Sequence, residues 1–210
     1  MPEPGPPRPP GPCELIPDDY FRRLDKGEIF GDPARPLEVD VGCGDGGFLV
    51  ALAQAFPERD FLGIERLLGR VRKVGRRAEQ AGLQNLKVLR LESSYAVGWL
   101  LPPSSVARLH LLCPDPWPKK KHHSRRLVQP EFVGAVHRCL EPEGEFLLKS
   151  DYLDYFTEAV ETVMGSGHFS QLDWPADAFP YPETDFERQW RAEGKAIHRA
   201  RFLRAPAPQE

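Results

Sequence analysis

The stretch that most constrains the fold of this chain is an apolar run that passes through a glycine-rich loop into an amphipathic run. Residues 37–42 read LEVDVG, the loop holds glycines at 42, 44, 46 and 47, and residues 48–56 read FLVALAQAF. Apolar residues recur at helical spacing in the last run, and Pro57 ends it. The pattern predicts a strand, a tight turn and a helix, which is how a parallel α/β unit begins.

The same alternation continues along the chain. Further strands are predicted at 60–65, 86–90, 106–113, 144–150, 168–172 and 197–203, and helices at 67–81, 129–140 and 152–164. Alternating elements of this kind predict an α/β fold with a doubly wound, Rossmann-like, mostly parallel sheet of seven strands and right-handed crossovers.

Composition predicts one domain with loose ends. Of the 210 residues 40% are hydrophobic, and seven of the first twelve are proline. We expect a proline-rich flexible tail over 1–17, a single catalytic domain over 18–204 and a flexible tail over 205–210. Without an apolar run of about 20 residues or a signal peptide, a cytoplasmic protein without membrane contact is expected. The four cysteines are far apart and His122-His123 reads as charged surface, so no metal site is expected.

Positive charge is concentrated in two segments, although the net charge is -3. Six basic residues lie within 66–77 and seven basic residues or histidines within 119–126. Arg66, Arg70, Lys73 and Arg77 are spaced as one helical stripe, which would suit a phosphate backbone or, equally, an ordinary solvated helix face. The local charge therefore keeps nucleic acid among the predicted partners.

The glycine loop predicts a nucleotide-type cofactor at the carboxyl ends of the strands. Gly42, Gly44 and Gly47 fit a dinucleotide fingerprint, whereas Gly42, Gly44 and Gly46 fit a methyltransferase-like one. Asp40, just before the loop, suits the cationic methionine end of S-adenosylmethionine better than a pyrophosphate. Glu65, at the end of the next strand, could accept ribose hydroxyls of either cofactor. Glu92 could lie at the adenine edge or be a solvated carboxylate.

The loop after the fourth predicted strand, CPDPWPKKKHH, carries a carboxylate, an aromatic face and cations together. Asp115, Trp117 and Lys119 match a purine base and its phosphates, although a basic loop can also be plain surface. Asp151 follows the fifth strand, where its carboxylate could accept the N1–H and N2–H₂ donors of guanine. In 184–187, Thr184 and Glu187 read first as a helix capping box.

From about Leu37 to Phe202 the chain resembles the bacterial tRNA (guanine-N7-)-methyltransferases, through PDPWPKKKHH followed by RR at 125–126, SDY at 150–152, and TDFE at 184–187. The resemblance implies the class I S-adenosylmethionine-dependent methyltransferase fold and a guanine at tRNA position 46 in the variable loop as the target. It implies cofactor contacts from Asp40, Gly42, Gly44, Gly46, Glu65, Glu92 and Asp115, and substrate contacts from Lys119, Asp151, Thr184, Asp185, Phe186 and Glu187. Asp115 and Asp151 are its implied catalytic residues. Glu92 stands where an aspartate is common.

Two other functional classes stay open at this point. A nicotinamide-dependent oxidoreductase would account for the glycine loop and Glu65, but leaves the PDPW loop unexplained. A non-catalytic RNA-binding protein on the same scaffold would not need Asp40, Asp115 and Asp151 together. The expected partner is tRNA; no obligatory protein partner is indicated, and either a monomer or a homodimer fits the sequence.

Overall fold

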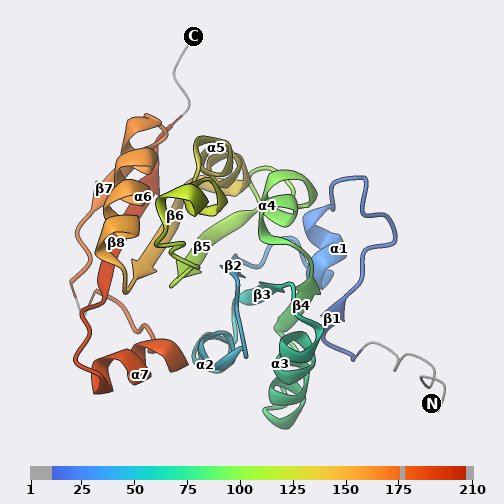
Figure 1. The fold of residues 1–210 in the computed structure, drawn as a ribbon. Coiled ribbons are helices and arrows are strands. Elements are labelled where there is room, and N and C mark those ends of the chain that lie inside the picture. Colours follow the sequence, from blue (N-terminus) through green and yellow to red (C-terminus); the bar gives the residue numbers. More distant parts are fainter. Residues whose placement is uncertain (1–10, 176–177, 207–210) are drawn as a thin grey trace, which may run out of the picture.

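The computed structural model describes residues 11–175 and 178–206, which form one mixed sheet with helices on both faces (Figure 1). Its strands are β1 (Glu14–Leu15), β2 (Leu37–Val41), β3 (Asp60–Glu65), β4 (Leu86–Arg90), β5 (Val106–Leu112), β6 (Leu140–Ser150), β7 (Phe169–Leu172) and β8 (His198–Arg204). Its α-helices are α1 (Lys26–Phe30), α2 (Gly47–Ala55), α3 (Leu68–Gln80), α4 (Ser93–Tyr95), α5 (Pro130–Cys139), α6 (Leu153–Gly165) and α7 (Asp185–Ala192). A π-helical turn, η1 (Ala96–Leu100), and a 3₁₀ segment, η2 (Lys120–Arg125), complete the described elements.

The strand order is β1-β4-β3-β2-β5-β6-β8-β7, and the pairs from β1 to β6 are parallel. Only β8 runs against its neighbours β6 and β7. The expected doubly wound, mostly parallel sheet is confirmed. The chain leaves β2 toward β3 and β4 on one side and returns to β5 and β6 on the other, so the topological switch point lies between β2 and β5.

The strand count and the N-terminal boundary need correction. The sheet has eight strands rather than seven, because Glu14 and Leu15 pair in parallel with Val88 and Leu89 of β4. Cys13 and Leu15 are also buried in the core. The predicted C-terminal boundary of the proline-rich tail, residue 17, is therefore too far along the chain, because the chain joins the sheet at Glu14. Residues 1–10 and 207–210 of the two expected tails lie outside the described residues.

Each face of the sheet has its own apolar cluster. One joins inward residues of β2 and β5 to α1, η1, α5 and α6, and the other joins β3 and β4 to α2 and α3. The alternation in β2 explains this division, since Val39 and Val41 enter the first cluster while Glu38 and Asp40 point to the opposite face. None of the described helices is both long and apolar enough to cross a membrane.

Candidate active site

Four neighbouring parallel strands end at one edge of the sheet, and the predicted site residues follow them. Glu65 closes β3, the glycine loop follows β2, the PDPW loop follows β5, and Asp151 follows β6. The order β3-β2-β5-β6 therefore places the predicted cofactor residues beside the predicted substrate residues, around the switch point.

The glycine loop is fastened to the neighbouring strand. The backbone N–H groups of Gly42 and Cys43 both donate to the carbonyl oxygen of Ile64 in β3, at 2.8 and 3.0 Å. Gly46, with φ of 78°, turns the chain into α2, and a Cβ there would stand 2.8 Å from Cγ2 of Val74. Both its backbone angle and its close approach to α3 therefore require glycine.

Asp40 and Glu65 form a buried acidic pair beside this loop. Their exposed fractions are 3% and 6%. Burial, and after it the nearby Glu65 carboxylate, raises the pKa of Asp40 to about 7. Such a pKa is typical of a buried carboxylic acid when nearby positive charges are too few to offset the cost of burying its ionised form. Among the described residues this holds for Asp40. The pair therefore fits a cationic ligand, as the amino and sulfonium groups of S-adenosylmethionine would be, and disfavours an anionic pyrophosphate.

Most of the predicted basic stripe on α3 contacts the glycine loop and Glu65, although Arg66, Arg70 and Lys73 stay exposed. Lys73 Nζ lies 2.5 Å from Asp45 Oδ2, and Arg77 Nη1 donates to the Asp45 carbonyl oxygen at 3.0 Å. The hydrogen bond from Lys73 lowers the pKa of Asp45. Arg70 lies 3.6 Å from the Glu65 carboxylate. Three of the four stripe residues thus contact the edge that carries the cofactor loop, a tertiary arrangement that helical spacing alone does not reveal.

Glu92 is exposed and caps the short helix α4. Its carboxylate accepts the backbone N–H of Tyr95 at 2.9 Å and the Ser94 hydroxyl at 3.2 Å. These contacts hold the carboxylate at the carboxyl end of β4. A contact with adenine stays a prediction.

The PDPW loop presents its polar groups to solvent. Asp115 and Lys119 are exposed, and Trp117 is half-buried with a positive φ of 42°. The guanidinium of Arg125 lies over the Trp117 ring at 5.0 Å, and the ring of His122 is 5.8 Å away. The basic segment 119–126 therefore packs back onto Trp117 through His122 and Arg125, while the side chain of Lys119 is exposed to solvent.

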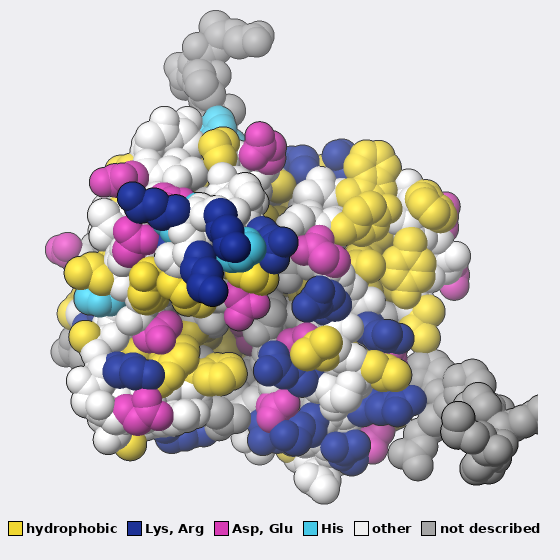
Figure 2. Space-filling model, in the orientation of Figure 1, with side chains coloured by type: hydrophobic (Ala, Val, Ile, Leu, Met, Phe, Trp, Pro, Cys, Tyr) yellow, Lys and Arg dark blue, Asp and Glu magenta, His cyan; other side chains and the backbone are white. Residues whose placement is uncertain are grey.

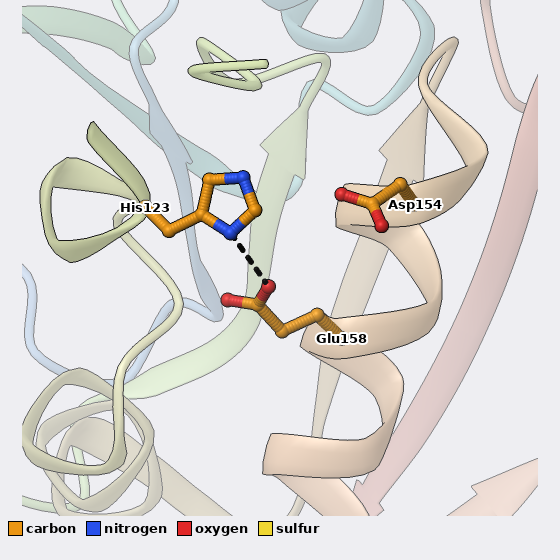
Figure 3. Close-up of side chains that lie close together, drawn as sticks. All are labelled: His123, Asp154 and Glu158. Carbon is orange, nitrogen blue, oxygen red and sulfur yellow. Dashed lines mark ion pairs between the residues drawn. The ribbon is translucent and has the colours of Figure 1, made fainter. Parts of the chain in front are cut away.

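His123 belongs to a side-chain cluster that sequence spacing did not reveal. Its Nδ1 lies 3.7 Å from Glu158, and Asp154 lies nearby, so the three could in principle hold a metal ion (Figure 3). Both carboxylates come from α6, about thirty residues further along the chain, which is why local spacing missed them. The guanidinium of Arg126 already bonds to Asp154 and to Glu158. A cation is thus built into this cluster, and we assign no metal to it.

The segment before and within α7 is anchored to β6. The capping box predicted for Thr184 and Glu187 is confirmed, with the Glu187 N–H donating to Thr184 Oγ1 at 3.0 Å and the Thr184 N–H to Glu187 Oε2 at 2.9 Å. The other oxygen of Glu187 pairs with the buried Lys149 at 2.5 Å. Phe186 is exposed and stacks on Trp190. The side chain of Asp185 lies outside what the structure describes.

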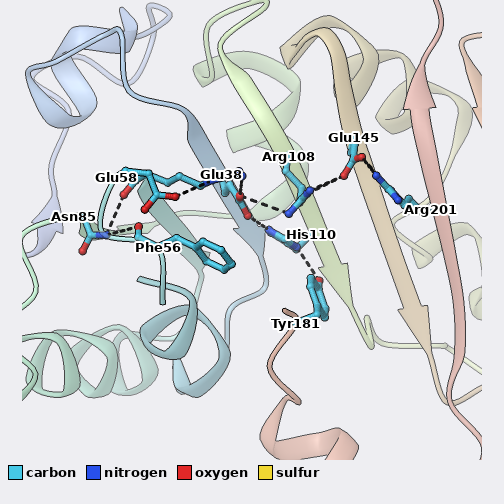
Figure 4. A network of polar contacts seen from close by, with 10 residues as sticks. Glu38, Phe56, Glu58, Asn85, Arg108, His110, Glu145, Tyr181 and Arg201 are labelled. Atoms are coloured by element: carbon cyan, nitrogen blue, oxygen red, sulfur yellow. Dashed lines mark hydrogen bonds and ion pairs between the residues drawn. The ribbon is translucent and has the colours of Figure 1, made fainter. Parts of the chain in front are cut away.

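A buried polar network under the site was not predicted from the sequence. His110 is fully buried between Glu38 Oε2, at 2.9 Å, and the hydroxyl of Tyr181, at 2.8 Å (Figure 4). Burial would raise the pKa of Glu38, but the hydrogen bond from His110 and the charge of Arg108 hold it at about 2. Because burial lowers the pKa of His110, we infer a neutral ring that donates from Nε2 to Glu38 and accepts the Tyr181 hydroxyl proton.

This network continues sideways and supports the segment that leads to α7. Arg108 joins Glu38 to Glu145, and Glu145 in turn pairs with Arg201 of β8 (Figure 4). The ring of Tyr181, three residues before Thr184, packs against Phe48 of α2 with centroids 5.0 Å apart. The sequence signals for this network were His110 and Arg108 inside one apolar strand and Glu38 inside another.

The fold resembles those of solved methyltransferases. The aminoglycoside resistance methyltransferase NpmB1 matches with a TM-score of 0.61 at 17% identity, covering 87% of this chain and 95% of that one. The 16S rRNA methyltransferase KamB matches with a TM-score of 0.62 at 18% identity, covering 81% and 88%. At such identities the likeness is one of fold. The chain has the class I S-adenosylmethionine-dependent methyltransferase fold, as its strand order and glycine loop also indicate.

Sequence relatives narrow this class to one family. The family described as "Putative methyltransferase" matches residues 34–200. The tRNA (guanine-N(7)-)-methyltransferase of Syntrophotalea carbinolica is 37% identical over 202 residues, which cover 91% of this chain and 86% of the relative. That of Halorhodospira halophila is 38% identical over 180 residues, covering 83% and 77%. The chain belongs to the tRNA (guanine-N(7)-)-methyltransferase family.

Proposed function

We propose that this protein transfers a methyl group from S-adenosylmethionine to N7 of guanine in tRNA, at position 46 of the variable loop. The observation that carries the proposal is the junction at the switch point. There the buried Asp40 lies on β2, next to the strand β5 that leads into the loop of Asp115, Trp117 and Lys119, and its acidic partner Glu65 lies one strand further away on β3. Relatives that bear the name tRNA (guanine-N(7)-)-methyltransferase support the same activity.

On the cofactor side, each strand end would take one part of S-adenosylmethionine. Asp40 would balance the cationic methionine end, and Glu65 would accept the ribose hydroxyls. The backbone of the loop at Gly42, Gly44 and Gly46 would approach the ligand closely. Glu92 and Asp115 would flank the adenine side and the methyl group. When bound, the cofactor supplies an electrophilic methyl group on a sulfonium, which is a good leaving group.

On the substrate side, the exposed groups would meet the RNA. Lys119 would contact a phosphate, and Asp151 would accept hydrogen bonds from N1–H and N2–H₂ of the guanine. Phe186, exposed on α7, would stack on a base. Thr184 and Glu187 would act chiefly by fixing the start of α7, since the bonds described above already occupy them, and Asp185 stays a proposed contact.

Methyl transfer to guanine N7 depends mainly on the alignment of the reacting atoms. Guanine N7 carries a free lone pair at neutral pH, so no base has to remove a proton before the methyl group moves. The task of the chain is to hold N7 in line with the methyl group and to offset the positive charge that passes onto the purine. Asp115 and Asp151, on neighbouring strand ends, are the groups that we propose for this charge compensation.

Basic side chains frame the same edge of the molecule. Figure 2 shows Lys and Arg side chains gathered over η2 and over α3. On α3, Arg72 and Arg76 are exposed one helical turn apart, away from the buried Val71, Val74 and Ala78. We propose that these two, rather than the residues turned onto the glycine loop, contact the tRNA backbone. We also propose that the chain from Glu14 to Arg204 acts as one catalytic domain in the cytoplasm, as a monomer or a homodimer and without an obligatory protein partner of another kind.

The test is incubation of the purified chain with radiolabelled S-adenosylmethionine and unmodified tRNA transcript, followed by digestion and chromatography of the nucleosides. We expect label in 7-methylguanosine, and loss of that label when the guanine at position 46 is replaced by adenine. Label in another nucleoside would refute the activity, and label that persists in the altered transcript would refute the position.

A further inference from the structure

Arg126 stands out because its side chain is completely buried at the end of an otherwise exposed basic run. Its exposed fraction is 0%, and it is among the largest fully buried side chains of the described chain. Burying a guanidinium is unfavourable unless its charge is paired and its N–H groups are bonded. Its partners therefore indicate what it does.

The partners come from two separate segments. Nε donates to the carbonyl oxygen of Pro116 at 2.9 Å, and Nη2 donates to Asp154 Oδ2 at 2.7 Å. Nη1 pairs with Glu158, and the ring of Tyr155 lies 5.2 Å from the guanidinium carbon. All three nitrogens are thus engaged, with one segment on one side and α6 on the other.

Both segments carry a carboxylate that we assign to catalysis. Pro116 is the residue after Asp115, and α6 begins two residues after Asp151. Residues 114–118 form neither helix nor strand. At its start the PDPW loop is tied to β6 by the Cys113 N–H, which donates to the Lys149 carbonyl oxygen at 2.8 Å. Arg126 provides the second tie, beyond Asp115.

We propose that Arg126 is a positioning residue that sets the distance between Asp115 and Asp151. Without the Arg126 guanidinium, Cys113 would be the one residue of the PDPW loop, among the described residues, that still has a hydrogen bond to the side of β6 and α6, and the two carboxylates would no longer keep a fixed separation across the proposed purine site. Methyl transfer is sensitive to such displacement, since a misplacement of about 1 Å can cost roughly 100-fold in rate. The inference rests on the proposed function for its effect on catalysis, but not for its effect on the loop.

The first test compares Arg126→Lys with wild type. Lysine keeps the charge but loses the planar fork that reaches a carbonyl and two carboxylates at once. We expect kcat to fall about 10- to 100-fold while the Kd for S-adenosylmethionine weakens by no more than about threefold, because Asp115 is the one proposed cofactor contact on this loop and the acidic pair and the glycine loop are untouched. A parallel loss of cofactor affinity and kcat would overturn the proposal in favour of a general folding defect.

A matched control exists at the opposite edge of the sheet. Arg35 also joins a carboxylate to carbonyl oxygens at the start of β3: it bonds to Asp60 at 2.9 Å, to the Pro57 carbonyl at 2.6 Å and to the Arg59 carbonyl at 3.1 Å. Arg35→Lys should lower thermal stability less than Arg126→Lys, because the Arg35 side chain is 33% exposed, and should leave kcat unchanged. If Arg35→Lys reduced kcat as much as Arg126→Lys, the effect would be one of stability and the proposal would fail.

Hydrogen exchange gives a readout that does not depend on activity. In Arg126→Lys, amide exchange should accelerate at Cys113, Asp115 and Trp117 and in residues 151–154, and stay unchanged in the glycine loop. Unchanged exchange in both loops would overturn the positioning role even if catalysis suffered. If instead wild type formed no 7-methylguanosine, the proposed function would fail, and faster exchange in Arg126→Lys would still establish the tie between the loops.

Discussion

The two halves of the active edge are built differently. On the β2–β3 side the important groups sit at strand ends and are buried: Asp40 and Glu65 are both less than 10% exposed. On the β5–β6 side Asp115 is exposed, and the loops are held by buried cationic side chains, Arg126 and Lys149. The β2–β3 side, which we propose to bind the cofactor and call the cofactor half, thus relies mainly on backbone hydrogen bonds. The β5–β6 side, which we propose to bind the substrate and call the substrate half, relies more on buried ion pairs. A small, invariant ligand suits the first design, and a large RNA needs the open surface of the second.

Single carboxylate replacements should separate the two halves most strongly. We expect Asp151→Ala to lower kcat at least 100-fold, and up to about 1,000-fold, with cofactor Kd within about threefold, because charge compensation is lost only in the transition state. Asp40→Ala should instead weaken cofactor binding. Initial rates and calorimetric titration measure the two effects. Loss of cofactor affinity in Asp151→Ala would contradict the division.

The ion pair under α7 should dominate the stability of the substrate half. Glu187→Gln leaves Lys149 buried without its carboxylate, so we expect a loss of roughly 3 kcal/mol in the free energy of unfolding, measured by urea titration. The control is Glu183→Gln, which removes the ion pair between Glu183 and Arg191. The side chain of Arg191 is 63% exposed and that of Glu183 is 38% exposed. That change should cost less than about 1 kcal/mol. Equal losses would show that α7 is not anchored through Lys149.

The raised pKa of Asp40 predicts a pH dependence confined to the cofactor half. Its folded pKa of about 7 lies above the ordinary value, so the folded chain holds this proton between the two values and loses stability as pH rises toward 7. A cationic cofactor favours the ionised carboxylate. Binding should therefore release a proton below pH 7, and Kd should weaken up to about tenfold per unit as pH falls. Calorimetry in buffers of different ionisation enthalpy detects the proton, and a Kd constant from pH 5.5 to 7 would exclude this role.

The smallest effects should distinguish the two sets of cations on α3. Lys73→Met removes a half-exposed contact with Asp45, so cofactor Kd should weaken about threefold with no change in the salt dependence of tRNA binding. Arg72→Gln with Arg76→Gln should leave cofactor binding alone and reduce the slope of log K against log salt by about 1 per lost phosphate contact. Fluorescence titrations at several salt concentrations measure both. If Lys73→Met instead reduced the salt dependence of tRNA binding and the double variant did not, the RNA-binding surface would be the stripe of Arg66, Arg70, Lys73 and Arg77.

The residue pattern was enough to predict the seven longer strands of the sheet, the place of the candidate cofactor residues, and a resemblance to the family that the sequence relatives then established. The apolar runs at β2, β3 and β5 and the glycines after Asp40 are local signals, because one strand end and one tight turn are encoded by contiguous residues. Parallel strands then necessarily bring their carboxyl ends to one edge, so Asp40, Glu65, Asp115 and Asp151 could be placed together without coordinates. The capping box at Thr184 and Glu187 was equally local.

Which charged residues are buried became clear only from contacts between distant segments. Arg126 and Arg125 are adjacent in a uniformly basic run, yet Arg126 is buried on Asp154 and Glu158 while Arg125 lies over Trp117. Likewise Glu14 and Leu15 form β1 after a stretch whose prolines predicted a loose tail. In each case the partner lies far away in sequence. Whether a charge or a short strand is buried depends on what the folded chain brings against it, and local pattern does not contain that information.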